Sequence, residues 1–435
     1  MMDTTRLEIS RLFHRFGFGP KPGEFAHALK QGVDATRTQL LQLVPPAHDV
    51  GVSAVVDPVL ADLGNFPQSG TPARATFDMA MKAQRQMLTL WWLDRMALVE
   101  NALTERMTWF WHGHWATSIG KVEYSLPMYL QNQTLRTNAL GDFGTQSRAM
   151  IMDGALQYWL DGGANTVAAP NENLAREFME LFTLGVDHYL QIDVQSVASG
   201  LTGYKVNRSN GNVTFIAKNH DSSTFNILGS PATYNATQIS DLVVARDDCT
   251  QFIADRIWFR FISSDVPRPS SNAINTAFIG RNILKTVRAV ATSDAMSDPQ
   301  YSLVKSPVEW FIGLCRALEI TPSKLTKPAQ AIDFLNRLGQ VPFSPPNVGG
   351  WPAGQAWLTA ASAQYRLQLA QYLLAHADVS AIKAVPTSSR VRAVGDLLGV
   401  SSWSYRTERA LHDVATDPTR ILLLAASSPE YIVSA

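Results

Sequence analysis

The chain has 435 residues, of which 46% are hydrophobic and 17% are charged, so it is long enough to bury a large core. Lysine plus arginine and aspartate plus glutamate both count 37, and this balance does not favour a nucleic-acid partner, for which a basic stripe is expected. The two cysteines, Cys249 and Cys315, form no CxxC pair, which argues against a disulfide framework and against a thiolate zinc site.

No signal peptide is visible in the sequence, and no membrane span is expected. The first residues contain no apolar run of the signal-peptide type, and the longest apolar runs fall far short of the roughly 18 residues that cross a bilayer. The sequence therefore predicts a soluble protein. It leaves open whether the compartment is the cytoplasm or, by export together with a partner, the periplasm.

Helical patterns dominate the first half of the chain. Residues 24–44 carry apolar side chains at helical spacing and stop at Pro45-Pro46, while residues 48–73 are rich in Pro, Gly and Val and predict a loop. Residues 74–118 predict two long helices rich in Met, Leu and Trp. Further helical patterns cover 126–139, 143–158, 171–184 and 192–202.

The composition changes after Gly203. Residues 203–236 alternate in places and predict a β-hairpin with its turn at Asn210-Gly211. Helical patterns resume at 237–262, 272–295, 307–319 and 328–338, a Pro/Gly/Trp loop covers 341–358, and helices close the chain. We therefore predict a mainly α, multi-helix globular fold with a small β-hairpin insertion, organised as a single large helical unit over residues 1–435.

The segment 171–185, NENLAREFMELFTLG, predicts a helix capped by Asn171 and ended by Gly185. At about 100° per residue its apolar and charged side chains occupy opposite arcs. The charged arc, together with the first turn, contains Glu172, Arg176, Glu177 and Glu180. One interpretation is a solvated face with i,i+4 ion pairs. The other is that Glu177 and Glu180 point into a cleft as metal ligands or as an acid/base pair.

Two histidines lie in the segment 109–115, WFWHGHW, which is apolar nearly all round and is expected to be buried. On an ideal helix His114 points about 160° away from His112, so the two converge only where the helix ends or distorts near Gly113. They are either core histidines bonded to backbone or carboxylate, or metal ligands that meet Glu177 and Glu180. Imidazole plus carboxylate suits iron, manganese or zinc.

The pair His220-Asp221 follows the hairpin and precedes a Ser-Ser-Thr turn. Such residues often form turns, but Asp221 is also able to act as a ligand or to orient a histidine in the same pocket. The sequence has no HExxH, no Walker A lysine loop, no GxSxG elbow and no GxGxxG. A zincin, a P-loop protein, a serine hydrolase and a dinucleotide enzyme are therefore poorly supported.

Five blocks, taken in order, resemble the bacterial DUF1800 family, a domain of unknown function. They are RLFHRFGFGP at 11–20, ERMTWFWHGHWATS at 105–118, the segment 171–185 continued to Asp193 and Thr202-Gly203-Tyr204, His220-Asp221 with Leu228-Gly229, and PPNVGGWP at 345–352 with Trp357-Leu358. The resemblance runs from residue 11 to about 358. It implies a partner, because members of the family are often encoded beside a second family of exported proteins. Many relatives have histidine where this chain has Phe182, so a site that used that histidine is altered here.

Three hypotheses follow. The first is a metal-dependent enzyme, hydrolytic or redox, in which His112, His114, Glu177 and Glu180 hold a divalent ion. In it Glu177, Glu180, Arg176, His220 and Asp221 serve catalysis, with Glu172 as a substrate or supporting contact. The second is a non-catalytic partner or scaffold protein whose charged residues form a buried structural network. The third is a metal-free acid/base enzyme that uses Glu177 and His112.

Overall fold

The computed structural model describes residues 4–269 and 273–434. Within these residues the fold is built from α-helices with only three small two-stranded antiparallel sheets, which confirms the predicted mainly α class. None of the helices described is both long enough and apolar enough to cross a membrane.

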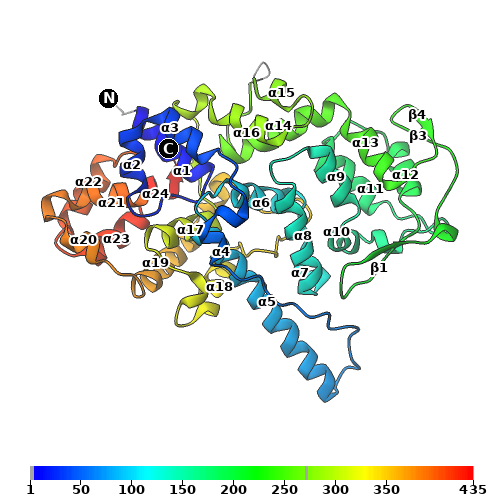
Figure 1. The fold of residues 1–435 in the computed structure, drawn as a ribbon, viewed down its shortest axis with the longest axis horizontal. Helices are drawn as coiled ribbons and strands as arrows, with labels where there is room; N and C mark the ends of the chain where they lie inside the picture. The colour runs from blue at the N-terminus through cyan, green and yellow to red at the C-terminus, as the bar shows by residue number, and fades with distance from the viewer. Residues whose placement is uncertain (1–3, 270–272, 435) are drawn as a thin grey trace.

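The elements follow one another along the chain as shown in Figure 1. Residues 4–200 form α1 (Thr4–Arg15), α2 (Glu24–Gln31), α3 (Val33–Leu40), α4 (Val50–Ser53), α5 (Pro72–Leu98), α6 (Leu103–His114), α7 (Ile119–Val122), α8 (Ser125–Thr137), α9 (Phe143–Ile151), α10 (Gly154–Trp159), α11 (Asn173–Glu177), the π-helix η3 (Phe178–Thr183) and α12 (Gln191–Gly200). The strands are β1 (Tyr204–Val206), β2 (Val213–Phe215), β3 (Phe225–Ile227), β4 (Ser230–Ala232), β5 (Leu303–Val304) and β6 (Val433–Ser434).

The second half of the chain is again helical. Its helices are α13 (Ala236–Val244), α14 (Asp247–Phe261), α15 (Ala273–Phe278), α16 (Ile283–Ala291), α17 (Pro307–Ala317), α18 (Pro328–Arg337), α19 (Ala360–Leu374), α20 (Ser380–Ala384), α21 (Arg390–Leu398), α22 (Tyr405–Asp413), α23 (Pro418–Ala426) and α24 (Pro429–Ile432). Short 3₁₀ turns are η1 (Pro46–His48), η2 (Gly162–Ala164), η4 (Ala217–Asn219), η5 (Asp294–Met296), η6 (Pro322–Lys324), η7 (Gly354–Trp357) and η8 (Thr387–Ser389).

Capping residues explain where several helices begin and where two predicted helices divide. The side chain of Thr71 accepts from the backbone N–H of Arg74, with Pro72 in the first turn of α5. The segment 24–44 is split into α2 and α3 at Gly32, whose φ of 86° only glycine adopts readily. The segment 143–158 is split because Asp153 caps a new helix, α10, through the N–H of Leu156.

The β excursion contains two hairpins where the sequence predicts one. Strands β1 and β2 pair antiparallel around a loop that includes Asn210-Gly211, as predicted. Strands β3 and β4 form a second hairpin whose turn residues, Leu228 and Gly229, both have positive φ. This turn was missed because leucine rarely adopts the left-handed region. Figure 1 places the second hairpin beside α12, at the end of the molecule opposite α20–α23.

Two large clusters of buried apolar side chains fill the interior. One gathers residues from α9 to α16, and the other gathers residues from α5 and from α17 to α24. Helix α6 lies between them, since Trp111 belongs to the first cluster and Trp109 to the second. The packing of the two clusters does not tell whether they unfold together. The prediction of a single helical unit over residues 1–435 therefore stays a prediction.

Buried arginines connect distant parts of the chain by donating to backbone carbonyls. Arg11 bonds to the carbonyls of Ala295, Met296 and Asp298, and Arg15 bonds to those of Phe261, Ile262, Tyr301 and Ser434. Both side chains are at most 1% exposed. These contacts satisfy carbonyls at the ends of helices and strands that would otherwise be buried without a donor. The arginines of the first sequence block therefore serve the fold.

Candidate functional site

The segment 171–185 forms a helix that changes type halfway. Helix α11 continues into the π-helix η3, where Thr183 Oγ1 donates to the carbonyl of Phe178 at 2.6 Å. Gly185, with φ of 88°, follows its end as predicted. In a π segment the backbone hydrogen bonds join residues five apart, here the N–H of Leu184 and the carbonyl of Met179, and such segments are frequent at functional sites. The most specific sequence block thus coincides with an uncommon backbone geometry.

The charged arc of this segment lies at the surface. Glu172 and Arg176 form an ion pair of 2.7 Å, and Arg176 also donates to Gln191 Oε1 at 3.0 Å. Glu180 accepts a hydrogen bond from the hydroxyl of Tyr189. Residues 186–192 therefore fold back along the charged arc.

Burial and a neighbouring carboxylate change the pKa of one residue on the charged arc, Glu177. Glu177 is half-buried, and burial followed by the charge of Glu180 raises its pKa. A carboxyl group whose pKa is raised by burial and by a neighbouring carboxylate is a feature of cation-binding and of acid/base sites, but it also arises on ordinary helix faces.

Exposed apolar side chains border the charged arc. Val186 is 60% exposed, Leu190 is 68% exposed and Ile192 is 59% exposed. They stand beside Tyr189 and Gln191, which contact Glu180 and Arg176. We call the surface made by Glu172, Arg176, Glu177, Glu180, Val186, Tyr189, Leu190, Gln191 and Ile192 the motif face.

The two histidines lie on α6 and point in different directions. His112 is 1% exposed, and its Nε2 accepts from the backbone N–H of Phe343 at 3.0 Å. His114 is 3% exposed, and its Nε2 lies 2.9 Å from the carbonyl of Phe182 on η3. Burial lowers the pKa of each imidazole to about 3, so both are neutral at physiological pH.

The structure does not bring the four predicted metal ligands together. His114 meets the apolar side of η3, whereas Glu177 and Glu180 lie on its partly exposed side. No group of three or more His, Cys, Asp and Glu side chains is suitably placed for a metal ion anywhere in the described residues. The two imidazoles instead hold the helix to backbone groups of two neighbouring segments.

His220 and Asp221 lie apart from the helix, after the first hairpin. His220 Nδ1 is 2.9 Å from the carbonyl of Thr202, and the backbone N–H of Asp221 donates to Thr202 Oγ1 at 2.8 Å. Asp221 Oδ1 accepts from the N–H of Ser223 at 3.0 Å, which is a turn contact. The pair thus anchors the loop to the end of α12.

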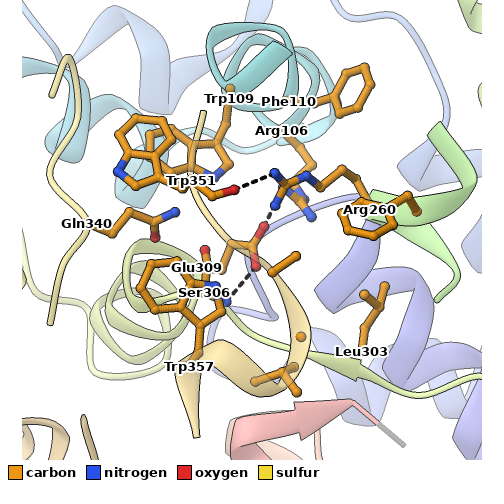
Figure 2. Close-up of a pocket in the computed structure, with 15 residues that line it drawn as sticks. Arg106, Trp109, Phe110, Arg260, Leu303, Ser306, Glu309, Gln340, Trp351 and Trp357 are labelled. Carbon is orange, nitrogen blue, oxygen red and sulfur yellow. Dashed lines mark hydrogen bonds and ion pairs between the residues drawn. The ribbon is translucent and has the colours of Figure 1, made fainter. Parts of the chain in front are cut away.

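A small cavity lies where α6, α14, α17 and the loop 341–358 meet, and Figure 2 shows its lining. Arg106 forms a 2.7 Å ion pair with Glu309, and Arg260 donates to the carbonyl of Trp351 at 2.9 Å. The ring of Trp351 stacks on Trp109 at a centroid distance of 5.1 Å. Residues of the second and last sequence blocks therefore form one wall.

The size of this cavity decides what it holds. Its volume is about 40 Å³, a few times the roughly 10–15 Å³ that a cavity needs to hold one water molecule. Within the described residues, Ser306 Oγ and Trp351 Nε1 are buried without a hydrogen-bond partner, and both belong to the lining. The cavity accordingly suits an ordered water better than a substrate.

Comparison with known protein families gives one match, which covers residues 11–433 and is described as a protein of unknown function, DUF1800. The chain belongs to the DUF1800 family. No curated protein and no solved structure matches the chain.

Membership in the DUF1800 family confirms the resemblance and extends it to the helices after residue 358. Phe182 is fully buried and packs on Trp115 at a centroid distance of 4.9 Å. The position therefore faces the core in this member, close to His114 and away from the motif face.

Sequence reasoning missed three charged residues that the structure makes central to the junction of the DUF1800 blocks. They are Arg106, Arg260 and Glu309. Burial, followed by the charge of Arg256, lowers the pKa of Arg260 to about 10, and the side chain stays cationic at neutral pH. One signal was available for Glu309. It stands three residues after Ser306 and before an apolar run, and its Oε2 accepts from the N–H of Ser306 at 2.9 Å.

Proposed function

We propose that this DUF1800 protein is a non-catalytic partner protein that presents its motif face to a second chain. The observation that carries this proposal is the composition of the face. Two bonded groups, Glu172 with Arg176 and Gln191, and Glu180 with Tyr189, stand at the surface beside three exposed apolar side chains. Apolar patches rimmed by polar groups are typical of protein interaction sites.

The buried groups of the other sequence blocks support the same proposal. His112, His114 and Arg15 all bond to backbone groups inside the protein. One imidazole nitrogen of each histidine and the two Nη nitrogens of Arg15 thus hold segments of the protein together. The occupant that we propose is the second exported protein that the family resemblance implies, encoded beside the gene.

Co-expression of the two proteins tests the proposal. We expect a stable complex by size-exclusion chromatography with light scattering, and Leu190→Asp should weaken the affinity measured by calorimetry at least about tenfold, since it places a charge in an apolar contact. Tyr405→Asp is the matched control, because Tyr405 is 80% exposed on α22, far from α12 in Figure 1. Failure of the wild-type proteins to associate, or equal weakening by both variants, would overturn the proposal.

A metal-dependent hydrolytic or redox enzyme is the second candidate, and one observation favours it. Glu177 and Glu180 are close enough for the charge of Glu180 to raise the pKa of Glu177. A divalent iron, manganese or zinc ion between these carboxylates would relieve that repulsion and supply Lewis-acid or redox chemistry. Catalytic roles for Arg176, His220 and Asp221 belong to this candidate.

Elemental analysis of the purified protein after reloading with metal tests the second candidate. We expect one bound ion per chain in the wild-type protein and a loss of that ion in Glu177→Gln. His112→Gln is the control, because its imidazole contacts Phe343 and the candidate predicts no effect on metal content. A wild-type stoichiometry near zero would sink the candidate.

A further inference from the structure

A cleft much larger than the cavity of Figure 2 opens near the junction of α5 and α6. Its volume is about 890 Å³, within the range of pockets that enclose a small-molecule ligand. Segments of the chain on both sides of α5 contribute to it, together with the end of α8. Its apolar lining consists of Leu43, Val44, Val52, Val55, Val99 and Leu140.

One buried carboxylate and two arginines stand among this lining. Glu105 is 1% exposed, and its oxygens accept from Arg95 Nε, from Arg136 Nε at 2.6 Å and Nη2 at 3.0 Å, and from Trp92 Nε1 at 3.1 Å. Burial alone would raise the pKa of Glu105, but Arg136 and then Arg95 lower it to about 2. The carboxylate is therefore ionised at neutral pH and holds both guanidinium groups in place.

The cluster keeps one unit of positive charge and several unused donors. In the described part of the chain, both arginines form ion pairs with Glu105 and with no other acid. Arg95 uses only Nε, so its two Nη nitrogens make no hydrogen bond to any described residue. Both side chains are at least nine-tenths buried, at 9% and 7% exposure, yet they line the cleft.

Two other acids, Asp49 and Asp57, line the cleft but form no ion pair with either arginine in the described part of the chain. The oxygens of Asp49 accept from the backbone N–H groups of Val52, Glu100 and Asn101. Asp57 makes no ion pair within 4.0 Å of either arginine among the residues described. An arginine side chain held rigid, with free Nη donors beside apolar walls, is a geometry that recognises a planar anion with an apolar body.

We propose that this cleft binds a small monocarboxylic acid, with its carboxylate on Arg95 and Arg136 and its apolar body against Leu43, Val44, Val52 and Val55. The single net charge of the cluster matches a monoanion better than a phosphate monoester, which carries close to two charges at neutral pH. The six apolar side chains favour a hydrocarbon body over a sugar. This binding site is separate from the motif face and does not depend on the partner proposal.

Calorimetric titration of the full chain with sodium octanoate tests the proposal. We expect saturable binding, with octanamide binding at least about tenfold more weakly because it lacks the charge. Leu43→Glu adds a negative charge at a position that is 51% exposed, so the fold should survive, and octanoate affinity should fall about tenfold. Val56→Glu is the matched control in the same segment, because Val56 is 86% exposed and does not line the cleft.

A second variant separates recognition by the guanidinium from simple charge attraction. Arg95→Lys keeps a cation beside Glu105 but removes the Nη fork, and it should weaken octanoate binding while thermal melting confirms a folded chain. Absence of saturable octanoate binding, equal binding of octanamide, or an unchanged affinity in Leu43→Glu would each overturn the proposal. Tighter binding of octyl phosphate than of octanoate would overturn the assignment to a carboxylate.

Discussion

Replacing Glu105 with alanine is expected to lower the free energy of unfolding by roughly 3–5 kcal/mol. The carboxylate accepts from Arg95, Arg136 and Trp92 and is 1% exposed. Its removal leaves two nearly buried guanidinium groups without a counter-charge, and the uncompensated charge costs far more than the pair contributes when intact. Chemical denaturation followed by circular dichroism measures the change.

A surface ion pair supplies the control for that measurement. Asp78 pairs with Arg74 on α5, and the two side chains are 54% and 32% exposed. Asp78→Ala should change the free energy of unfolding by less than about 1 kcal/mol, because water screens an exposed pair. A loss below 1 kcal/mol for Glu105→Ala as well would contradict the assignment of a tightly held buried cluster.

Local signals in the sequence predicted where many elements lie. The apolar spacing and the flanking loop predicted α5 and α6, and Asn210-Gly211 predicted the turn between β1 and β2. The division of residues 171–185 into an apolar and a charged arc also agrees with burial, since Leu174 and Phe178 are buried whereas Arg176 and Glu177 are not. These features depend on neighbours within a few positions, which a sequence displays directly.

Tertiary contacts decided the features that the sequence did not predict. His112 follows Glu105 by seven positions, and a helical wheel places them on one face. Glu105 pairs with Arg136 of α8, while His112 meets Phe343 of the last block. The π-helix was unforeseen because nothing in Phe178–Thr183 distinguishes a five-residue hydrogen-bond spacing from a four-residue one.

The buried arginines also show that tertiary contacts could not be predicted from the sequence. In the sequence Arg11 and Arg15 resemble the exposed face of a surface helix, yet they are buried and bond to carbonyls more than 240 positions away. A guanidinium has five donors, so it satisfies several helix ends at once, but which ends it reaches depends on the packing of helices. The cleft around Arg95 could not be predicted from the sequence for the same reason.

The second large effect that we predict is a loss of folding stability in acid that depends on His112. His112 is neutral in the folded protein because burial lowers its pKa to about 3, whereas an unfolded chain protonates histidine near its ordinary value of about 6.5. Between these values the unfolded state binds more protons than the folded state. The stability that the neutral imidazole contributes is therefore fully present above about pH 6.5 and is lost as the pH falls toward 3.

His112→Gln should make the protein less sensitive to acid, because the amide oxygen of glutamine is able to accept the N–H of Phe343 but does not titrate. Between pH 7 and pH 4 the wild-type protein should lose up to about 3 kcal/mol more free energy of unfolding than the variant, as linkage requires for this shift. Urea titrations at both pH values measure the difference, and His27→Gln, at an exposed position on α2, serves as the control. Parallel acid losses in the wild type and His112→Gln would mean that His112 titrates alike in both states, and its role as a neutral acceptor for the loop 341–358 would have to be abandoned.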